Sequence, residues 1–454
     1  MSGAPKRRVF PAGPRPSYGA PPVPAPSHSP AYARYVLGIL FVVFVFNFVD
    51  RQILAILLEP IKADLGASDT AMGFLTGIAF ALFYTVAGIP IARIADRGSR
   101  RTVIAVGLAL WSGMTALSGM AQTFAQLALA RVGVGVGEAA CSPPAHSLLA
   151  DYFPPERRAT ALAIYAMGIH VGILVGFIVG GWANQLLGWR QAFFIVGLPG
   201  LVLAIVVRLT VREPVRGIAD GLAHATETPS VSEALGILRH LGSLRHMALG
   251  AGLHSFAGYG LAAWGPAFLA RVHHMGSAEI GTWLGLITGF GGMIGAVLGG
   301  TLADRLGARD ERWRLWVPTI ASIVEVPLLY AFLLWPTPGP ALAIALPGIL
   351  AGAMWLGPVF ATTQTLVRPD MRALTSAVLL FVINLIGLGL GPQAVGVLND
   401  VLKGTFGAEA IRYSLLLVGL TNLWAAAHFA LAARDVRQDL RRVTTLTPAR
   451  SGAA

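Results

Sequence analysis

The fold is decided by two similar charged stretches: Asp96-Arg97-Gly98-Ser99-Arg100-Arg101, and Gly300-Thr301-Leu302-Ala303-Asp304-Arg305-Leu306-Gly307-Ala308-Arg309. Each follows a long apolar segment and precedes another one. Each places an aspartate directly before an arginine in a short polar connection. A charged turn that recurs at the equivalent place of the second half of a chain indicates an internal duplication.

The composition around these turns is that of a membrane protein. Of 454 residues, 55% are hydrophobic and only 12% are charged, whereas about a quarter of a soluble domain is charged. A helix needs about 20 apolar residues to cross a bilayer. On this rule we expect twelve membrane-spanning helices, at residues 33–57, 70–92, 102–121, 124–149, 159–184, 190–211, 246–270, 277–303, 315–335, 340–366, 373–397 and 411–433.

The positions of the basic residues predict the orientation. Most of the 34 Lys and Arg residues lie in the two tails and in alternate loops, and cytoplasmic loops carry such an excess. The opposite side holds only Lys62, Arg190, Arg271, Lys403 and Arg412. We therefore expect a multi-pass protein of the plasma (inner) membrane with both termini cytoplasmic. Because the basic residues flank apolar segments, the net charge of +12 does not indicate nucleic-acid binding.

The longest polar interruption divides the chain into two halves. The predicted fold is an all-α membrane protein with twelve transmembrane helices in two six-helix halves. The predicted segments are a disordered cytoplasmic tail at 1–32, an N-terminal bundle at 33–211, a cytoplasmic loop at 212–245, a C-terminal bundle at 246–433 and a cytoplasmic tail at 434–454.

Charged residues inside the apolar segments are the candidate functional residues, since they are costly to bury in a bilayer. Asn47, Asp50 and Arg51 lie in the first segment. Arg131 and Glu138 lie in the fourth, seven residues apart and so on one helix face. We expect these side chains to form one cluster at mid-membrane, with Arg51 able to exchange between the carboxylates. We also expect Gly135 to give the first helix room to approach the fourth.

This cluster suggests proton coupling. Burial favours the protonated form of a carboxyl group and a nearby arginine favours the ionised form, so changing water access can load and release a proton. The alternative is a permanent salt bridge that only holds the bundle together. The two arginines can also bind an anionic group of a substrate.

Other polar residues are weaker candidates for the cavity wall. His170, His254 and Tyr259 are candidate substrate contacts, with packing as the alternative. Glu325 is expected to form a structural pairing. The single cysteine, Cys141, excludes an internal disulfide and provides no metal cluster. The sequence contains no nucleotide-binding loop or nucleophile motif, so we expect neither an enzyme nor a cofactor.

The duplicated turn resembles the signature loop of the major facilitator superfamily, although Ala92 stands where that loop usually opens with glycine. A carboxylate at a helix end can accept hydrogen bonds from a neighbouring helix and from arginines. We therefore expect a gating latch formed by Asp96, Arg97, Arg101, Asp304 and Arg305.

Three further stretches resemble the Spinster family, whose members export lysophospholipids or sphingoid-base phosphates. They are Asn47 to Arg51, Arg131-Val132-Gly133-Val134-Gly135-Val136-Gly137-Glu138-Ala139, and Trp264-Gly265-Pro266. The resemblance implies proton-linked transport with Asp50 and Glu138 as the titrating groups.

The leading hypothesis is a monomeric, proton-coupled secondary transporter that moves an amphipathic anionic lipid by alternating access. Its partners would be membrane lipids, protons and this substrate. One alternative is a proton symporter of a small organic acid that the arginines anchor. Another is a membrane receptor or scaffold that does not transport.

Overall fold

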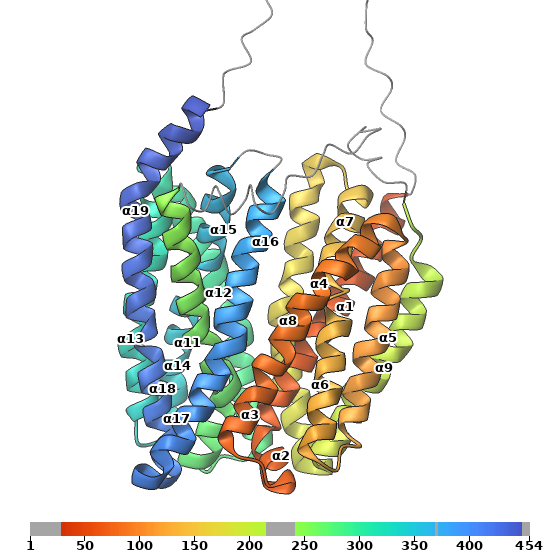
Figure 1. Ribbon diagram of the computed structural model, residues 1–454, viewed down its shortest axis with the longest axis vertical. Coiled ribbons are helices and arrows are strands. Elements are labelled where there is room, and N and C mark those ends of the chain that lie inside the picture. The colour runs from red at the N-terminus through yellow and green to blue at the C-terminus, as the bar shows by residue number, and fades with distance from the viewer. Residues whose placement is uncertain (1–28, 215–240, 368–370, 447–454) are drawn as a thin grey trace, which may run out of the picture.

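A computed structural model describes residues 29–214, 241–367 and 371–446, and no β-strand occurs among them. Residues 1–28 of the predicted N-terminal tail and most of the predicted central loop lie outside this described part. Figure 1 shows two helical bundles side by side, α1 to α9 in one and α11 to α19 in the other. The predicted all-α fold with two halves is therefore confirmed.

Twelve membrane-length passes run through the described residues. Ten stretches are long and apolar enough to cross a bilayer. One of them, Leu374–Arg442, reverses at Gly407 and makes two passes, and the less apolar α11 completes the twelve.

The first half consists of α1 (Pro30–Ile56), α2 (Leu58–Leu65), α3 (Asp69–Thr76), α4 (Ile78–Arg97), α5 (Arg100–Ser118), α6 (Phe124–Glu138), α7 (Ser142–Tyr152), α8 (Pro155–Leu187) and α9 (Trp189–Thr210). The second consists of α11 (Gly242–Val272), α12 (Ser277–Gly307), α13 (Trp313–Leu334), α14 (Pro338–Gly352), α15 (Leu356–Thr365), α16 (Arg372–Val382), η3 (Ile383–Leu390), α17 (Gly391–Phe406), η4 (Gly407–Glu409), α18 (Ala410–Gly419) and α19 (Thr421–Leu446).

Most helix ends lie a few residues from the sequence-based boundaries, and three of them are informative. The first helix begins at Pro30, because the Ser29 side chain accepts a hydrogen bond from the Tyr32 amide and caps it. α4 continues to Arg97 rather than ending at residue 92. The predicted tail from residue 434 is helical as far as Leu446, since apolarity marks where a helix meets lipid and not where it ends.

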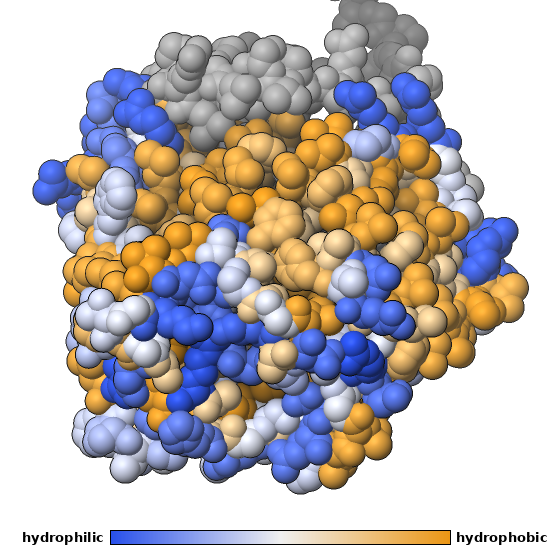
Figure 2. All heavy atoms as spheres, turned by 60° about the horizontal axis from the view of Figure 1, so that its bottom comes forward, coloured by the Kyte–Doolittle hydropathy of each residue, from blue (hydrophilic) through white to orange (hydrophobic). Residues whose placement is uncertain are grey.

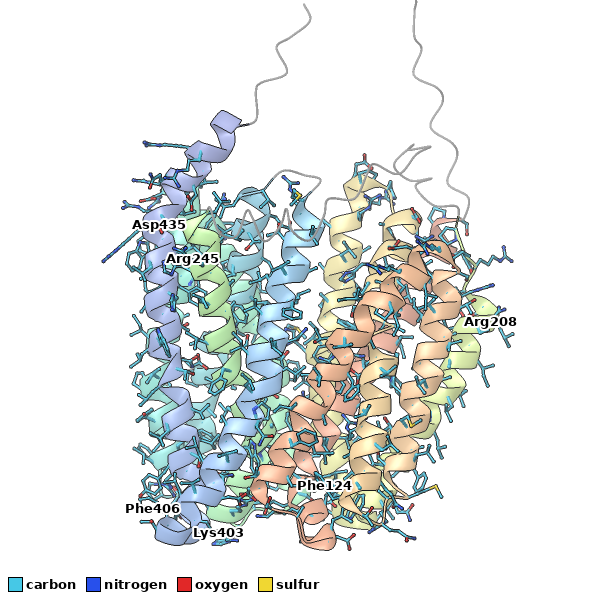
Figure 3. All side chains as sticks on the ribbon, viewed as in Figure 1. Phe124, Arg208, Arg245, Lys403, Phe406 and Asp435 are labelled. Atoms are coloured by element: carbon cyan, nitrogen blue, oxygen red, sulfur yellow. The ribbon has the colours of Figure 1, made fainter. Side chains whose placement is uncertain are left out.

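The two ends of the molecule have different character. Arg208, Arg245 and Asp435 lie at one end, which we call the basic end, and Phe124 and Lys403 lie at the other, the far end (Figure 3). Figure 2 shows hydrophilic residues gathered at the far end and hydrophobic residues on the flanks. Exposed large side chains such as Leu129, Leu186 and Leu209 contribute to these flanks, as expected for a surface that meets lipid.

Small residues allow α8 and α1 of the first half to pack closely. Gly168, Gly172, Gly176 and Gly180 recur every fourth residue of α8 and face α1. A Cβ atom added at Gly172 would lie 2.5 Å from the Cβ of Phe48. The glycine face therefore packs α8 directly on the helix that carries Asp50 and Arg51.

The two halves meet closely near the far end. Gly181 of α8 and Gly281 of α12 each approach the backbone of the other helix. Gly396 of α17 packs against the backbone of Asp69 at the start of α3. These contacts all lie in the far-end portions of their helices.

The glycine-rich run before Pro392 forms the wider turns of a π-helix, η3. Such segments are frequent at functional sites in helices. Gly389 lies here against Gly77, at the join between α3 and α4, where an added Cβ on Gly77 would be 2.5 Å from the Gly389 oxygen. The irregular turn thus allows the halves to touch beside the candidate site.

Candidate functional site

Asp50 of α1 forms an ion pair with Arg131 of α6. The Arg131 Nη1 atom donates to Asp50 Oδ1 over 3.1 Å. The Thr115 hydroxyl on α5 lies 2.8 Å from the same oxygen and 2.9 Å from the Trp111 carbonyl. Asp50 and Arg131 are 1% and 2% exposed, so this ion pair is out of contact with bulk solvent.

Arg51 of α1 forms a second ion pair, with Glu138 of α6. Arg51 Nε donates to Glu138 Oε2 over 2.8 Å, and Glu138 is fully buried. The Arg51 guanidinium also lies about 5 Å from the ring centres of Phe48, Phe80 and Tyr84. A cation held between aromatic faces remains stabilised by their ring quadrupoles when its carboxylate partner changes charge.

The structure thus brings the four predicted side chains together as two crossed ion pairs. The Phe80 ring, 5.0 Å from the Arg51 guanidinium and 5.9 Å from that of Arg131, lies beside both pairs. The expectation for Gly135 is wrong: a Cβ there would lie 2.9 Å from the Phe80 backbone oxygen on α4. That glycine therefore admits α4, which carries the shared ring, and not the first helix.

Each carboxyl group keeps one oxygen without a partner. Asp50 Oδ2 and Glu138 Oε1 are buried, and neither has a hydrogen bond to any described residue. The Arg131 Nε atom is in the same situation. Buried polar atoms are nearly always paired, so unpaired carboxyl oxygens at this depth are places where a proton can be held.

A cavity between the two halves reaches both arginines. Its walls include Phe48, Arg51, Phe80 and Arg131 from the first half, and Tyr259, Leu388 and Pro392 from the second. Two guanidinium groups therefore border an otherwise largely apolar space. Tyr259 lies opposite them, at the position where the sequence suggested a wall residue.

The remaining candidates of the first half lie close to helix contacts. Asn47 is 2% exposed, one turn of α1 before Asp50. His170 of α8 packs at the interface with α12, where a Cβ added to Gly292 would lie 2.9 Å from its Nδ1 atom. The position of His170 between the halves fits packing as well as substrate contact.

His254 lies away from the cavity, inside the second half. Its Nδ1 atom is 3.1 Å from the Ser322 hydroxyl and its Nε2 atom is 2.9 Å from the Gly352 carbonyl. Its Nε2 is also 3.8 Å from a Glu325 oxygen, which is beyond hydrogen-bond distance, so the structural pairing expected for Glu325 stays a prediction. No cluster of metal-binding side chains occurs in the part of the chain that the structure describes.

At the basic end, the main ionic anchor is Arg100, which sequence reasoning did not select. Arg100 is 2% exposed and binds Asp151 Oδ2 at 2.5 Å and Glu213 Oε1 at 2.8 Å. Burial raises the pKa of Glu213, but hydrogen bonds from the Arg101 amide, Arg100 and Ser99 outweigh it and hold this pKa below its ordinary value.

The residues predicted to form the gating latch have surroundings that differ from those of the buried Arg100. Asp96, Arg97, Asp304 and Arg305 are exposed. Arg101 donates to the Val211 carbonyl over 3.0 Å, within its own half. Their gating role stays a prediction for a different conformation.

A second ionic network, also missed from the sequence, joins the halves at the far end. Arg271 of α11 binds Asp69 through both terminal nitrogens, at 2.5 and 2.9 Å, and Glu59 at 2.5 Å. The Asp400 carboxylate of α17 accepts from the amides of Asp69 and Thr70, at 3.2 and 2.7 Å. The one available signal was that Arg271 is among the few basic residues on that side.

Comparison with known proteins agrees with this architecture. Residues 40–392 match the family described as Major Facilitator Superfamily. The chain is 40% identical over 420 residues to an MFS-type efflux pump of Mycolicibacterium smegmatis, covering 92% of this chain and 96% of that protein. It is 27% identical over 380 residues to Protein spinster of Drosophila melanogaster, covering 81% and 62%.

Among solved structures, a bacterial homologue of the human lysosomal transporter Spinster, in an inward-facing and unoccupied conformation, superposes with a TM-score of 0.83. The identity is 32%, and the match covers 91% of this chain and 99% of that one. Both resemblances predicted from the sequence are confirmed.

Proposed function

The chain belongs to the major facilitator superfamily, as a transporter related to Spinster, and we propose that it is a proton-coupled secondary transporter of an amphipathic anionic lipid. The cargo is of the lysophospholipid or sphingoid phosphate type, moved by alternating access. The observation that carries the proposal is a cavity with apolar and aromatic walls that is also lined by the two arginines of the crossed ion pairs.

The cavity supports an anionic, amphipathic cargo. Arg51 and Arg131 both border it, and guanidinium groups bind phosphate through paired hydrogen bonds. Phe48, Phe80 and Leu388 supply apolar surface beside them. A head group would therefore lie against the arginines, with its chain along the apolar wall.

The ion pairs support coupling to protons. When Glu138 takes up a proton on its unpaired oxygen, its charge no longer holds Arg51. The three aromatic rings keep the guanidinium in place, so it becomes available to an anionic head group. Asp50 and Arg131 would respond in the same way, because one Asp50 oxygen is also unpaired.

The closed far end supports alternating access from the basic end. The network around Arg271 and the close helix contacts join the halves there. We propose that the basic end is cytoplasmic, that the protein works as a monomer in the plasma membrane, and that the cavity opens to the cytoplasm. The similarity to an efflux pump supports outward movement of the cargo.

Reconstituted protein tests the proposal. Liposomes carrying an internal pH dye are given lysophosphatidic acid or succinate as the probe, and proton flux is followed. Lysophosphatidic acid should drive proton flux in the wild type. Glu138→Gln and Asp50→Asn should each abolish it, whereas Glu279→Gln, at an exposed acid of α12, should leave it unchanged.

The outcomes separate the three hypotheses. Flux with succinate and none with the lysolipid would make the protein a symporter of small organic acids. Absence of flux with every ligand that binds would favour a receptor or scaffold. Wild-type flux in both carboxyl variants would refute the assignment of Asp50 and Glu138 to coupling.

A further inference from the structure

The second half contains a buried ionisable centre of its own, outside the cavity. It is formed by His254 of α11 and Glu325 of α13, which are 4% and 8% exposed. The two side chains are 3.8 Å apart, between His254 Nε2 and Glu325 Oε2. Neither residue is used in the transport mechanism proposed above.

The hydrogen bonds around His254 fit two protonation states. As a neutral ring with its proton on Nε2, it donates to the Gly352 carbonyl at 2.9 Å and accepts from the Ser322 hydroxyl at 3.1 Å. As a cation, it donates to both oxygens and faces the Glu325 carboxylate. The site can therefore exchange protons without moving the ring.

The carboxyl group of Glu325, unlike the ring of His254, has few hydrogen-bond partners. Its Oε2 atom is buried without a hydrogen bond to the described residues. The Asn422 amide of α19 is close enough to Glu325 to interact with it, although both polar atoms of Asn422 are buried without a strict hydrogen bond to the described residues. A carboxylate left so poorly solvated is stable only with a proton on itself or on His254.

The nearest helices bring few other charges. α14 and α15 contain no ionisable residue, and those of α12 and α18 lie at their ends. The next ionisable pair is His246 of α11 with His428 of α19, whose Nδ1 atoms are 2.9 Å apart. His246 is eight residues before His254, about 12 Å along the helix toward the basic end.

The pair of His254 and Glu325 lies at a place in the second half that corresponds to the place of Asp50 and Arg131 in the first half. His254, Glu325 and Gly352 belong to α11, α13 and α14, which are the first, third and fourth passes of the second half. Asp50, Thr115 and Arg131 belong to the first, third and fourth passes of the first half. In each half, therefore, a buried carboxyl group with one unpaired oxygen lies beside a basic side chain, Asp50 beside Arg131 and Glu325 beside His254. In each half the surrounding groups come from the first, third and fourth passes.

From this arrangement we propose that His254 and Glu325 form a second proton-binding site, which holds one proton shared between them. Protonation converts the Glu325 carboxylate to the carboxylic acid, and His254, hydrogen-bonded to Ser322 and Gly352, is the neutral neighbour with which this proton exchanges. The proton leaves to water when the second half moves and wets the site. The existence of the site does not depend on the cargo, and only its part in transport rests on the proposed function.

Infrared difference spectroscopy of the purified full-length protein tests this site directly. As pH rises, the C=O stretching band of a protonated carboxyl group should disappear, and it should shift in D₂O. The band should be absent in Glu325→Gln and retained in Glu138→Gln, which removes the acid of the other half. A Glu138→Gln protein that keeps the band but loses proton flux would support both proposals independently.

Two glycines of α14 give a matched pair of variants that keep both ionisable residues. A Cβ at Gly352 would lie 2.6 Å from Glu325 Oε1, whereas one at Gly348 would meet only the Leu328 Cβ at 3.6 Å. Gly352→Ala should move the titration midpoint of the band by ~1 pH unit or more, a tenfold change in proton affinity. Gly348→Ala should not move it.

Three results would overturn the proposal. One is a spectrum in which Glu325→Gln removes no titrating carboxyl band. Another is an unchanged midpoint in Gly352→Ala. The third is displacement of the band by Na⁺ at constant pH, which would make the centre a cation site.

Discussion

Arg271→Met should weaken the closure of the far end. Arg271 is the second-half residue that binds both Asp69 and Glu59 of the first half. Removing one member of a buried, hydrogen-bonded ion pair costs about 3–5 kcal/mol. Lys62 remains paired with Asp69 in the variant and part of Arg271 is exposed, so we expect about 2 kcal/mol, or roughly a 30-fold shift toward a state open at the far end.

The measurement is a distance distribution between spin labels on the two halves. The single cysteine, Cys141, is buried beside the Tyr165 hydroxyl, and Cys141→Ser gives a background without reactive thiols. Labels at Gln122 and Lys403, both exposed at the far end, report the separation of the halves. Arg271→Met should populate a longer distance that is nearly absent in the parent.

Arg412→Met is the matched control. Arg412 also lies at the far end, but it pairs with Glu409 of the same half at 2.6 Å. Its removal should leave the distance distribution unchanged. If Arg271→Met gives the parental distribution, or if both variants open the far end equally, the network around Arg271 does not hold the two halves together.

Two further predictions concern packing and the basic end. Gly172→Ala brings a Cβ within 2.5 Å of that of Phe48 and should lower the thermal unfolding midpoint, since overpacking costs about 1–3 kcal/mol. Gly88→Ala, which meets no atom within 4 Å, should not, and equal midpoints would contradict the packing argument. Because folding lowers the pKa of Glu213, its stabilisation is present at neutral pH and is lost as pH falls through the folded value. Arg100→Gln should therefore lower the midpoint at pH 7 and flatten its acid dependence, and an unchanged acid limb would argue against the pairing.

The passes and the charged cluster could be predicted because each rests on a local cost. A long apolar segment has few alternatives to crossing a bilayer, and a charge within it must find a partner. That reasoning selected Asp50, Arg51, Arg131 and Glu138. It could not choose which acid pairs with which base, since this depends on how α1 and α6 are rotated and on the Phe80 ring that α4 inserts beside both.

The far-end network was beyond sequence reasoning for a different reason. Glu59, Asp69 and Arg271 are charged residues near loops. A charge near a loop need not be buried in the bilayer, so its presence in the sequence does not indicate a partner. Their partnership joins positions about 200 residues apart in the sequence. Only the docking of the two halves brings them together, and hydropathy does not encode that docking.

The two copies of the charged turn share sequence, but they do not share the side chains that anchor them. Both copies keep an Asp-Arg pair, yet the buried anchor of the first copy is Arg100, and Ala308 stands at its place in the second. There, Arg437 of α19 instead reaches Asp310 at 3.0 Å from outside the turn. The ionic anchors of the two turns are therefore different residues, while the shared Asp-Arg pairs, Asp96-Arg97 and Asp304-Arg305, are exposed. Internal symmetry therefore predicts where the two turns lie, but not which side chain forms the buried ionic anchor of each.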